Sequence, residues 1–329
     1  MTPLLEVHDL VKHFPLARGL ERLLPGREAR VLRAVDGISF TVAPGETLGL
    51  VGESGCGKTT TSRLILRAIE PTGGRIVFDS QDITTLGPRE LLPFRRKAQI
   101  VFQDPYTSLN PRMTVGRIIG EPIAVHRLAT ATELPRRVRE LLDMVGLQAE
   151  HAARYPHELS GGQRQRVGIA RALGLGPRLI VADEAVSALD VSVRAQILNL
   201  FVDLRERLDL SYLFVSHDLG VIRFLSHRVA VMYLGRLAEV APTRELYERP
   251  LHPYTKALMA AIPTVANGGG SMFDQPGRLI EGELPSSIDL SRGCRFASRC
   301  PFRFARCDEV EPELKTAGAA HAVACHLYD

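Results

Sequence analysis

Residues 52–59 read Gly-Glu-Ser-Gly-Cys-Gly-Lys-Thr, and this stretch decides the fold class. It fits the pattern G-x-x-x-x-G-K-[S/T] in its usual context, because the buried-strand run Thr47–Val51 precedes it and a helical run follows. The glycines let backbone N–H groups curl around a phosphate, Lys58 reaches the β- and γ-phosphate oxygens, and the Thr59 hydroxyl can hold Mg²⁺. The stretch predicts a phosphate-binding loop between a strand and a helix.

A cysteine stands at a variable position of this loop. We interpret Cys56 as a small loop residue without a role of its own. The alternative is a redox role, because a thiol at the start of a helix can have a lowered pKa.

Short apolar runs alternate with helical patterns on both sides of the loop, from Leu4 to about Tyr247. The strand-like runs are residues 38–42, 47–51, 76–78, 100–102, 179–182, 212–215 and 229–232. The clearest helical patterns are residues 58–70, 160–175 and 192–208. Strands that alternate with helices predict an α/β domain with a largely parallel sheet.

The composition is that of an ordinary globular protein. The length of 329 residues suggests about two domains, and 45% hydrophobic with 24% charged residues excludes collagen-like and wholly disordered chains. The net charge is only +4, so composition alone predicts neither a nucleic-acid nor an anionic-membrane partner. No apolar stretch is long enough to span a bilayer, and the acids in Met1–Asp9 do not fit a secretory signal. We therefore expect the protein in the cytosol.

Two adjacent carboxylates follow another buried run. Leu179–Ala182 delivers Asp183 and Glu184 to the carboxyl end of a strand, where open α/β sheets bind their ligands. Asp183 suits the outer coordination shell of Mg²⁺. Glu184 is then placed to orient or deprotonate the water that attacks a γ-phosphate.

A glycine pair opens the helical pattern near residue 160. Residues 159–166 read Leu-Ser-Gly-Gly-Gln-Arg-Gln-Arg, in which Ser160 fits a capping position. The glycine N–H groups make this a second helix start suited to an anion. A simple P-loop GTPase or kinase has no use for two such sites in one chain.

These motifs together resemble the ATP-binding subunits of ABC transporters, over roughly Leu4 to Tyr247. The resemblance implies a P-loop ABC-type ATPase domain with a mostly parallel sheet, an antiparallel β part and a helical subdomain. The residues implied to bind ATP are Phe14, Gly52, Glu53, Ser54, Gly55, Cys56, Gly57, Lys58, Thr59, Thr60 and Gln103. Mg²⁺ would be held through Thr59, Gln103 and Asp183, and the catalytic residues would be Glu184 and the switch histidine His217.

The same resemblance implies that two such domains dimerise head to tail. The signature residues of one subunit would close on the ATP held by the other, and these are Ser160, Gly161, Gly162 and Gln163. Asp190, in the stretch 187–190, would contact the partner. A monomer should therefore hydrolyse ATP inefficiently.

Two positions depart from the family pattern. Residue 185 is alanine, where the family usually has proline after the catalytic glutamate, and we expect only a modest backbone effect. Phe14 follows the first strand as the family's adenine-stacking aromatic does, but the basic insertion Arg18–Arg30 intervenes. Val31, beside the next strand, cannot stack on a base.

Two further stretches resemble the dipeptide, oligopeptide and nickel importer subgroup, namely residues 105–112 (Pro-Tyr-Thr-Ser-Leu-Asn-Pro-Arg) and 251–255 (Leu-His-Pro-Tyr-Thr). The implied function is ATP hydrolysis that energises the import of di- and oligopeptides. The implied partners are a second ATPase subunit, two membrane permease subunits and an extracytoplasmic solute-binding protein. The implied location is the cytoplasmic face of the membrane, with residues 104–127 toward the permeases.

Two alternatives remain open for the function. One is an ATPase for nickel or another small solute. The other, from a different class, is a soluble ABC-type ATPase that acts on nucleic acid or ribosomes. A single ATPase core with no coiled-coil insertion favours transport, as do residues 252–254, and no nucleic-acid partner is expected.

Four of the five cysteines crowd the last 36 residues: Cys294, Cys300, Cys307 and Cys325. Disulfides are disfavoured in a reducing cytosol, so a metal-binding or catalytic role for the cluster is favoured over disulfide bonds. Five arginines lie around three of these thiols, at positions 292, 295, 299, 303 and 306, with no acid between 292 and 307. They would offset the negative charge of four thiolates around a metal core. Some subgroup members carry a [4Fe-4S] cluster on similar cysteines, so we expect iron-sulfur here, with Zn²⁺ or free thiols as alternatives.

The predicted organisation is an ATP-binding domain over residues 1–250, with its helical signature subdomain at about 104–175. A small C-terminal domain of the oligopeptide-transporter type, which holds the four cysteines, would cover residues 251–329.

Overall fold

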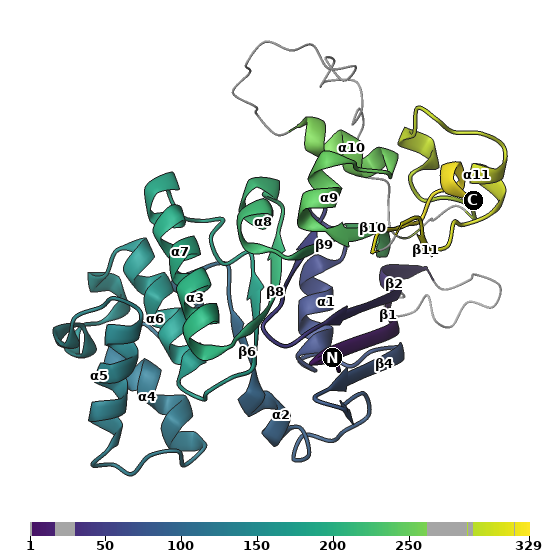
Figure 1. Ribbon diagram of the computed structural model, residues 1–329. Coiled ribbons are helices and arrows are strands. Elements are labelled where there is room, and N and C mark those ends of the chain that lie inside the picture. Colours follow the sequence, from purple (N-terminus) through teal and green to yellow (C-terminus); the bar gives the residue numbers. More distant parts are fainter. Residues whose placement is uncertain (1, 17–29, 262–287, 289–291, 319) are drawn as a thin grey trace. The chain divides into compact units, whose positions relative to one another are not determined.

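The computed structural model describes residues 2–16, 30–261, 288, 292–318 and 320–329 (Figure 1). The chain forms two compact units. The first unit comprises Met1–Leu5, Val42–Thr47 and Phe78–Ser216, and the second comprises Glu6–Thr41, Leu48–Val77 and His217–Asp329. Each unit is built from separated stretches of sequence, and the predicted boundary near residue 250 stays a prediction.

The first unit contains helices and strands, and three of its strands pair in parallel. Its strands are β5 (Gln81–Asp82), β6 (Ala98–Val101), β7 (Leu179–Asp183) and β8 (Ser211–Ser216). Its helices are α2 (Leu92–Lys97), α3 (Pro105–Ser108), α4 (Val115–Val125), α5 (Leu134–Met144), α6 (Gly161–Leu173) and α7 (Val191–Leu208), with short 3₁₀ turns η2 (Ala149–Ala153) and η3 (Pro156–Glu158). β7 pairs in parallel with β6 on one side and with β8 on the other.

The apolar runs explain these strands. Every residue of β7 and of β8 is buried, as expected for parallel strands that are covered on both faces. Within the same unit, α4, α5 and α6 pack against one another (Figure 1). The face of α5 that carries Val138, Leu141 and Leu142 is buried, which is the amphipathic pattern of a helix on a core.

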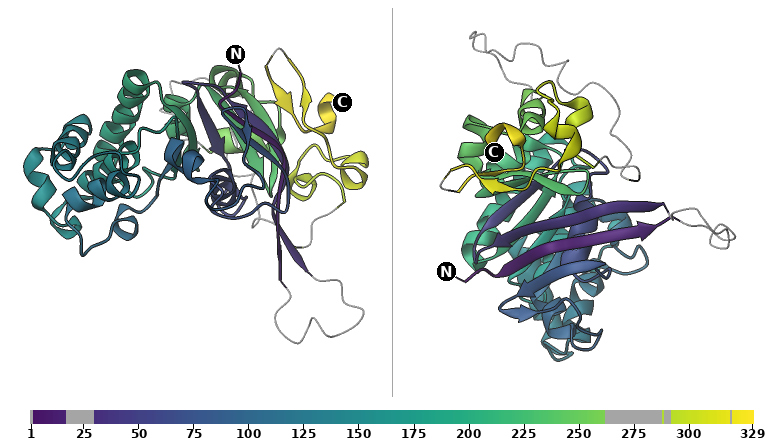
Figure 2. Two further views of the ribbon diagram at one scale, coloured as in Figure 1. Left: turned by 90° about the horizontal axis from the view of Figure 1, so that it is seen from below. Right: turned by 90° about the vertical axis from the view of Figure 1, so that its right-hand side faces the viewer.

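The second unit contains antiparallel and parallel strands. Its strands are β1 (Leu5–Pro15), β2 (Val31–Val42), β3 (Thr47–Val51), β4 (Gly73–Phe78), β9 (Arg228–Tyr233), β10 (Arg236–Pro242), β11 (Lys315–Thr316) and β12 (Ala322–Val323). Its helices are α1 (Lys58–Ile65), α8 (Leu219–Leu225), α9 (Thr243–Glu248), α10 (Pro253–Ala260) and α11 (Arg306–Glu309), with η4 (Ala297–Arg299) and η5 (His326–Tyr328). Strands β2, β1 and β4 are neighbours in one sheet, and they run side by side in the right-hand view of Figure 2.

The C-terminal part of the chain continues a sheet of the second unit. β3 pairs in parallel with β9, β9 pairs with β10, and β10 pairs in turn with β12 near the end of the chain. The carboxylate of Glu239 in β10 is fully buried and accepts hydrogen bonds from the Leu251 and His252 N–H groups. It also bonds the His321 ring at 2.6 Å. Glu239 thus ties the start of α10 and the C-terminal segment to the same strand.

In the part of the chain that the structure describes, no helix combines the length and the apolar character needed to cross a membrane.

Candidate functional site

The phosphate-binding loop lies in the second unit, between β3 and α1, as the sequence predicts. Gly57 has φ = 112°, and a Cβ atom there would lie 2.1 Å from the Ala34 carbonyl oxygen. A Cβ on Gly52 would lie 2.1 Å from the Met232 carbonyl oxygen. Because neither backbone oxygen can give way, both positions require glycine. The Gly235 N–H also donates to the Cys56 carbonyl at 2.8 Å and fixes the loop from the β9–β10 side.

The side chain of Lys58 lies against the loop. Its Nζ donates to the Gly52 carbonyl at 2.8 Å and to the Glu53 carbonyl at 2.9 Å. Lys58 is also the first residue of α1, so its ammonium and the N–H groups of the first helical turn lie at the same end of the helix. This combination of a positive side chain and a helix N-terminus suits a phosphate. Thr59 and Thr60 follow on the first turn, and Thr59 is exposed.

Cys56 does not have the properties of a redox thiol. It is buried, and this burial raises the pKa of its thiol, the reverse of the lowered pKa that a reactive cysteine needs. The neighbouring Lys58 opposes this effect but does not overcome it. The interpretation of Cys56 as a loop residue without redox chemistry agrees with this environment.

Phe14 and His217 are the other predicted site residues in the second unit. Phe14 is half-buried in β1, with Lys12 Nζ 5.0 Å from the centre of its ring. Residues 18–29 of the predicted insertion lie outside the described residues. Leu16 donates its N–H to the Arg30 carbonyl at 2.8 Å, which links the two described ends of that segment. His217 is exposed and comes directly after β8, and the next residue, Asp218, caps α8.

The two carboxylates stand where the first unit's parallel strands end. Asp183 is the last residue of β7 and is buried. Glu184 has φ = 50°, a region that residues with a Cβ seldom occupy, and its N–H donates to the Val215 carbonyl at 2.9 Å. Backbone strain of this kind persists where surrounding contacts impose it and is frequent at active sites.

Gln103 lies at the same edge of the sheet as these carboxylates. In the register of the parallel pair, Val101 of β6 is level with Ala182 of β7, so the chain leaves both strands side by side. Gln103 is exposed, and the preceding residue is held by Gln165, whose Nε2 donates to the Phe102 carbonyl at 3.4 Å. The first unit therefore brings Gln103, Asp183 and Glu184 to the carboxyl ends of two neighbouring strands, β6 and β7.

The signature stretch forms a capped helix start, as predicted. The Ser160 Oγ accepts a hydrogen bond from the Gln163 N–H at 3.3 Å, and the Gln163 Oε1 accepts one from the Ser160 N–H at 3.0 Å. This reciprocal pair is a capping box. Gly161 is exposed on the first turn, while Gly162 lies so close to Val193 that an added Cβ would approach its Cγ1 to 2.4 Å.

Asp190 lies beside the signature and caps the next helix, α7. Its carboxylate accepts hydrogen bonds from the Val193 N–H at 2.9 Å and from the Ser192 hydroxyl at 2.8 Å. These bonds, the backbone one foremost, lower the pKa of Asp190. The starts of α6 and α7 therefore pack together in one unit. The predicted contact of Asp190 with a partner stays a prediction, and its capping role is a structural finding.

The four C-terminal cysteines border one cavity in the second unit. They are free thiols, and they line this cavity together with His252 and His326. Burial raises the pKa of Cys294 to about 11 and also raises the pKa of Cys300 and Cys325. Among the described residues, however, no three His, Cys, Asp or Glu side chains are arranged to hold a metal ion. The structure thus gives no support to a [4Fe-4S] cluster or a zinc ion.

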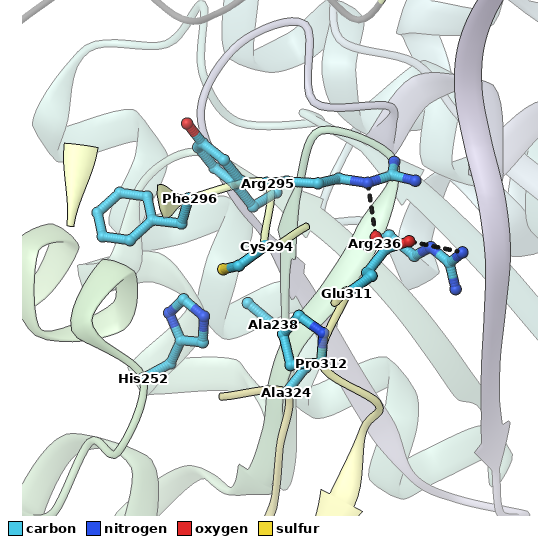
Figure 3. A pocket seen from close by; sticks show the side chains of 10 residues that line it. Arg236, Ala238, His252, Cys294, Arg295, Phe296, Glu311, Pro312 and Ala324 are labelled. Atoms are coloured by element: carbon cyan, nitrogen blue, oxygen red, sulfur yellow. Dashed lines mark hydrogen bonds and ion pairs between the residues drawn. The ribbon is translucent and has the colours of Figure 1, made fainter. Parts of the chain in front are cut away.

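The arginines between these cysteines do not serve the thiols. Four of the five predicted to balance thiolate charge pair instead with carboxylates elsewhere in the chain: Arg295 with Asp36 and Glu311, Arg299 with Glu53, Arg303 with Asp308, and Arg306 with Asp329. Figure 3 shows Arg295 and Arg236 converging on Glu311, with Cys294 on the other side of the same pocket. The charge argument for a cluster was therefore wrong, because it counted only the acids between positions 292 and 307, and all of these partners lie outside that stretch.

Two residues that contact the loop were not recognised from the sequence. Tyr254 was interpreted only as part of a subgroup marker, and Arg299 only as a charge beside thiols. Both bond Glu53, the second residue of the phosphate-binding loop. They are separated from it by 201 and 246 residues, and no local pattern signals such a contact.

Comparison with known proteins agrees with this geometry. A family model for ABC transporters matches residues 35–187, and a model for the C-terminal region of oligopeptide/dipeptide transporters matches residues 238–307. An oligopeptide transport ATP-binding protein of Bacillus subtilis, AppF, is 50% identical over 99% of this chain and 97% of its own length. A probable peptide ABC transporter ATP-binding protein of Sinorhizobium fredii is 49% identical over 98% of this chain and 90% of its own.

Solved structures show the same likeness. The dimeric ATP-binding cassette MJ0796, in a post-hydrolysis state with ADP and Pi, matches with a TM-score of 0.63 and 29% identity, over 73% of this chain and 99% of its own. CbiO1 of Clostridium perfringens matches with a TM-score of 0.65 and 26% identity, over 76% of this chain and 92% of its own.

The fold and its phosphate-binding loop define an ATPase of the ABC class, which uses ATP and Mg²⁺. Within that class, the chain belongs to the family of peptide-transporter ATP-binding proteins that share the oligopeptide/dipeptide C-terminal region.

Proposed function

We propose that this chain is the ATP-hydrolysing subunit of an importer of di- and oligopeptides. The observation that carries the proposal is the 50% identity to an oligopeptide transport ATP-binding protein over 99% of the chain, the C-terminal region included. That C-terminal region also matches the oligopeptide/dipeptide transporter model, which favours a peptide over another small solute.

In the proposed site, the second unit binds the phosphates of ATP. The loop from Gly52 to Thr59, with Thr60, wraps the phosphates, and Lys58 exchanges its bonds to loop carbonyls for bonds to the β- and γ-phosphates. Phe14 stacks on the adenine. Bound Mg²⁺ neutralises phosphate charge, and the residues that would hold it are Thr59, Gln103 and Asp183. Their oxygen-bearing side chains are the ligand type that Mg²⁺ prefers.

Hydrolysis depends on residues from the strand ends. Glu184 deprotonates or orients the attacking water, and His217 contacts the γ-phosphate side of the site. The signature residues Ser160 to Gln163 act on the ATP of a second ATPase subunit, and Asp190 lies at that contact. The exposed start of α6 supports this assignment, because a partner's phosphate can reach its first-turn N–H groups.

The proposed assembly contains a second ATPase subunit, identical or homologous, and two permease subunits, with an extracytoplasmic solute-binding protein. The chain would lie peripherally on the cytoplasmic face of the membrane. Exposed apolar side chains in the segment expected to meet the permeases support this placement, because Tyr106 is 59% exposed and Val125 is 71% exposed.

Transport by the purified complex in proteoliposomes tests the function. Uptake of a labelled oligopeptide should require ATP, Mg²⁺ and the solute-binding protein, and a Lys58→Ala chain should abolish it. A complex that takes up nickel but no peptide would contradict the proposal.

We also propose that the four cysteines form one ligand site, with iron-sulfur ahead of zinc. The resemblance of their pattern to that of cluster-bearing subgroup members supports this, whereas the shared cavity shows only that the four thiols lie near one another. Anaerobic purification followed by visible absorption and metal analysis tests it. A colourless protein free of iron and zinc would leave the cysteines as free thiols.

A further inference from the structure

The acidic residue of the phosphate-binding loop is held at both its backbone and its side chain. The Glu53 N–H donates to the Tyr254 hydroxyl at 2.9 Å. Arg299 Nη1 donates to both Glu53 carboxylate oxygens, at 3.1 and 3.2 Å. Tyr254 is in the first turn of α10, and Arg299 ends η4, so both holding groups come from the C-terminal part of the chain.

These two residues are themselves fixed by an aromatic cluster. Tyr254 is fully buried, with its ring centre 4.6 Å from that of Tyr233. The Arg299 side chain is 6% exposed, and its Nη1 also donates to the Tyr233 hydroxyl at 3.3 Å. Phe296 packs edge-on against Tyr233 at 5.4 Å. The hydroxyl and the guanidinium are therefore held in place before any nucleotide arrives, which is the condition for positioning a loop.

Glu53 carries a negative charge inside the phosphate-binding loop, so its ion pair with Arg299 affects how the loop can bind a phosphate. A carboxylate in a loop that wraps a triphosphate repels the ligand, and this repulsion is stronger in a partly buried site than in water. Lys58 bonds the Glu53 backbone carbonyl, not its carboxylate. Of the ion pairs between described residues, the one that engages the Glu53 carboxylate is formed by Arg299.

We propose that Arg299 and Tyr254 are positioning residues for ATP binding, which fix the loop at Glu53, and that Arg299 offsets the carboxylate charge that would oppose the triphosphate. This inference rests on the proposed role of the loop in holding ATP. It assigns to the C-terminal part of the chain a direct effect on nucleotide affinity.

Nucleotide binding by the full chain tests the inference, with a fluorescent ATP analogue and Mg²⁺ as the probe. Arg299→Gln should raise the Kd about tenfold at low salt, and the loss of affinity should shrink as added salt screens the repulsion between the Glu53 carboxylate and the triphosphate. Glu53→Gln alone should lower the Kd about threefold. The double variant should bind within about threefold of wild type, because the uncompensated charge is gone. Tyr254→Phe should raise the Kd by about threefold, since it removes one bond to the loop.

Arg303→Gln is the matched control. Arg303 belongs to the same segment and pairs with Asp308, away from the loop, so its loss should leave the Kd unchanged. A folded Arg299→Gln variant with wild-type affinity would overturn the inference, as would a double variant no better than Arg299→Gln. If Arg299→Gln does not fold, Glu53→Gln decides, because weaker binding in that variant contradicts the charge argument. Lys58→Ala separates the two proposals: if it binds ATP normally, the loop assignment itself fails.

Discussion

Gly52 and Gly57 of the phosphate-binding loop lie too close to other backbone atoms to carry a side chain. The carbonyl oxygens of Met232 in β9 and Ala34 in β2 would each lie 2.1 Å from a Cβ atom on Gly52 and Gly57, respectively. Residue 53 needs no glycine, but its carboxylate needs a partner, which Arg299 supplies. The loop thus has two positions that only glycine can occupy, Gly52 and Gly57, and one charged residue, Glu53, that is paired with an arginine far away in the sequence.

Gly57→Ala should abolish nucleotide binding and destabilise the fold. Its φ of 112° and a Cβ 2.1 Å from the Ala34 oxygen force the backbone to move. We expect at least 2 kcal/mol, roughly, to be lost from the free energy of unfolding. Denaturant unfolding and ATP binding measure both effects.

Gly168→Ala is the control for that substitution. Gly168 lies inside α6, and apart from its own helix backbone no atom of the described residues would lie within 4 Å of its Cβ. Alanine should raise stability there by up to about 1 kcal/mol, because glycine is a poor helix former. If Gly57→Ala and Gly168→Ala lost equal free energy of unfolding, the geometry of the loop would not be the cause of the destabilisation.

Single residues in motifs could be predicted from the sequence, whereas residues that act across long separations could not. Ser160 and Gln163 form the expected capping box because the motif and its partner are three residues apart. Arg295 and Arg299 were misinterpreted because their carboxylate partners, Asp36 and Glu53, are brought near only by the fold. Contacts of this kind carry no local pattern.

Helices α6 and α7 of the first unit begin where short side chains cap them. Ser160 caps α6 and Asp190 caps α7, so the signature and the residue expected at a dimer contact are fixed by their helices. The predicted helices over 160–175 and 192–208 are confirmed in α6 and α7. The cap at Ser160 was predicted from the sequence, whereas the cap at Asp190 is a structural finding.

Asp190→Ala should lower the melting temperature at neutral pH by about 2–4 °C. The folded-state pKa of Asp190 is lowered, so its contribution is full above its ordinary pKa of 3.8 and is lost as the pH falls through the lowered value. The difference from wild type should therefore be present at pH 7 and narrow below about pH 4. Thermal unfolding at several pH values measures it.

The control for the cap is Asp203→Ala, an exposed position within the same helix. It should not lower the melting temperature, because it removes no capping bond. A pH-independent loss in Asp190→Ala would contradict the capping account.

The element that joins the C-terminal segment to the sheet is β10, through Glu239. Glu239→Ala leaves the N–H groups of Leu251 and His252 without their acceptor and removes the bond to the Nε2 atom of His321. We expect a loss of about 3 kcal/mol in the free energy of unfolding. Denaturant titration measures this, with Glu245→Ala as control, since Glu245 bonds the same histidine but is 40% exposed. A similar loss in both variants would show that burial of Glu239 does not matter.

At the scale of the molecule, the ATPase fold could be predicted and the attachment of the C-terminal segment could not. The runs at 47–51, 179–182 and 212–215 became β3, β7 and β8 because continuous apolar stretches between loops fit buried parallel strands. The pairing of β10 with β12 was missed, because β12 has two residues and its partner lies some 80 positions earlier. A strand of two residues is too short to show the alternating hydrophobic pattern from which strands are predicted.

The central claim is that the chain hydrolyses ATP with Glu184 as catalytic base, in composite sites between two ATPase subunits. Its most direct test is Glu184→Gln, in the full chain with its partner ATPase subunit. ATP turnover should fall at least about 100-fold, while ATP with Mg²⁺ converts the subunits into a stable dimer seen by size-exclusion chromatography with light scattering. Glu206→Gln, an exposed substitution in α7, should change neither property. Wild-type turnover in Glu184→Gln, or no ATP-dependent dimer, would contradict the claim.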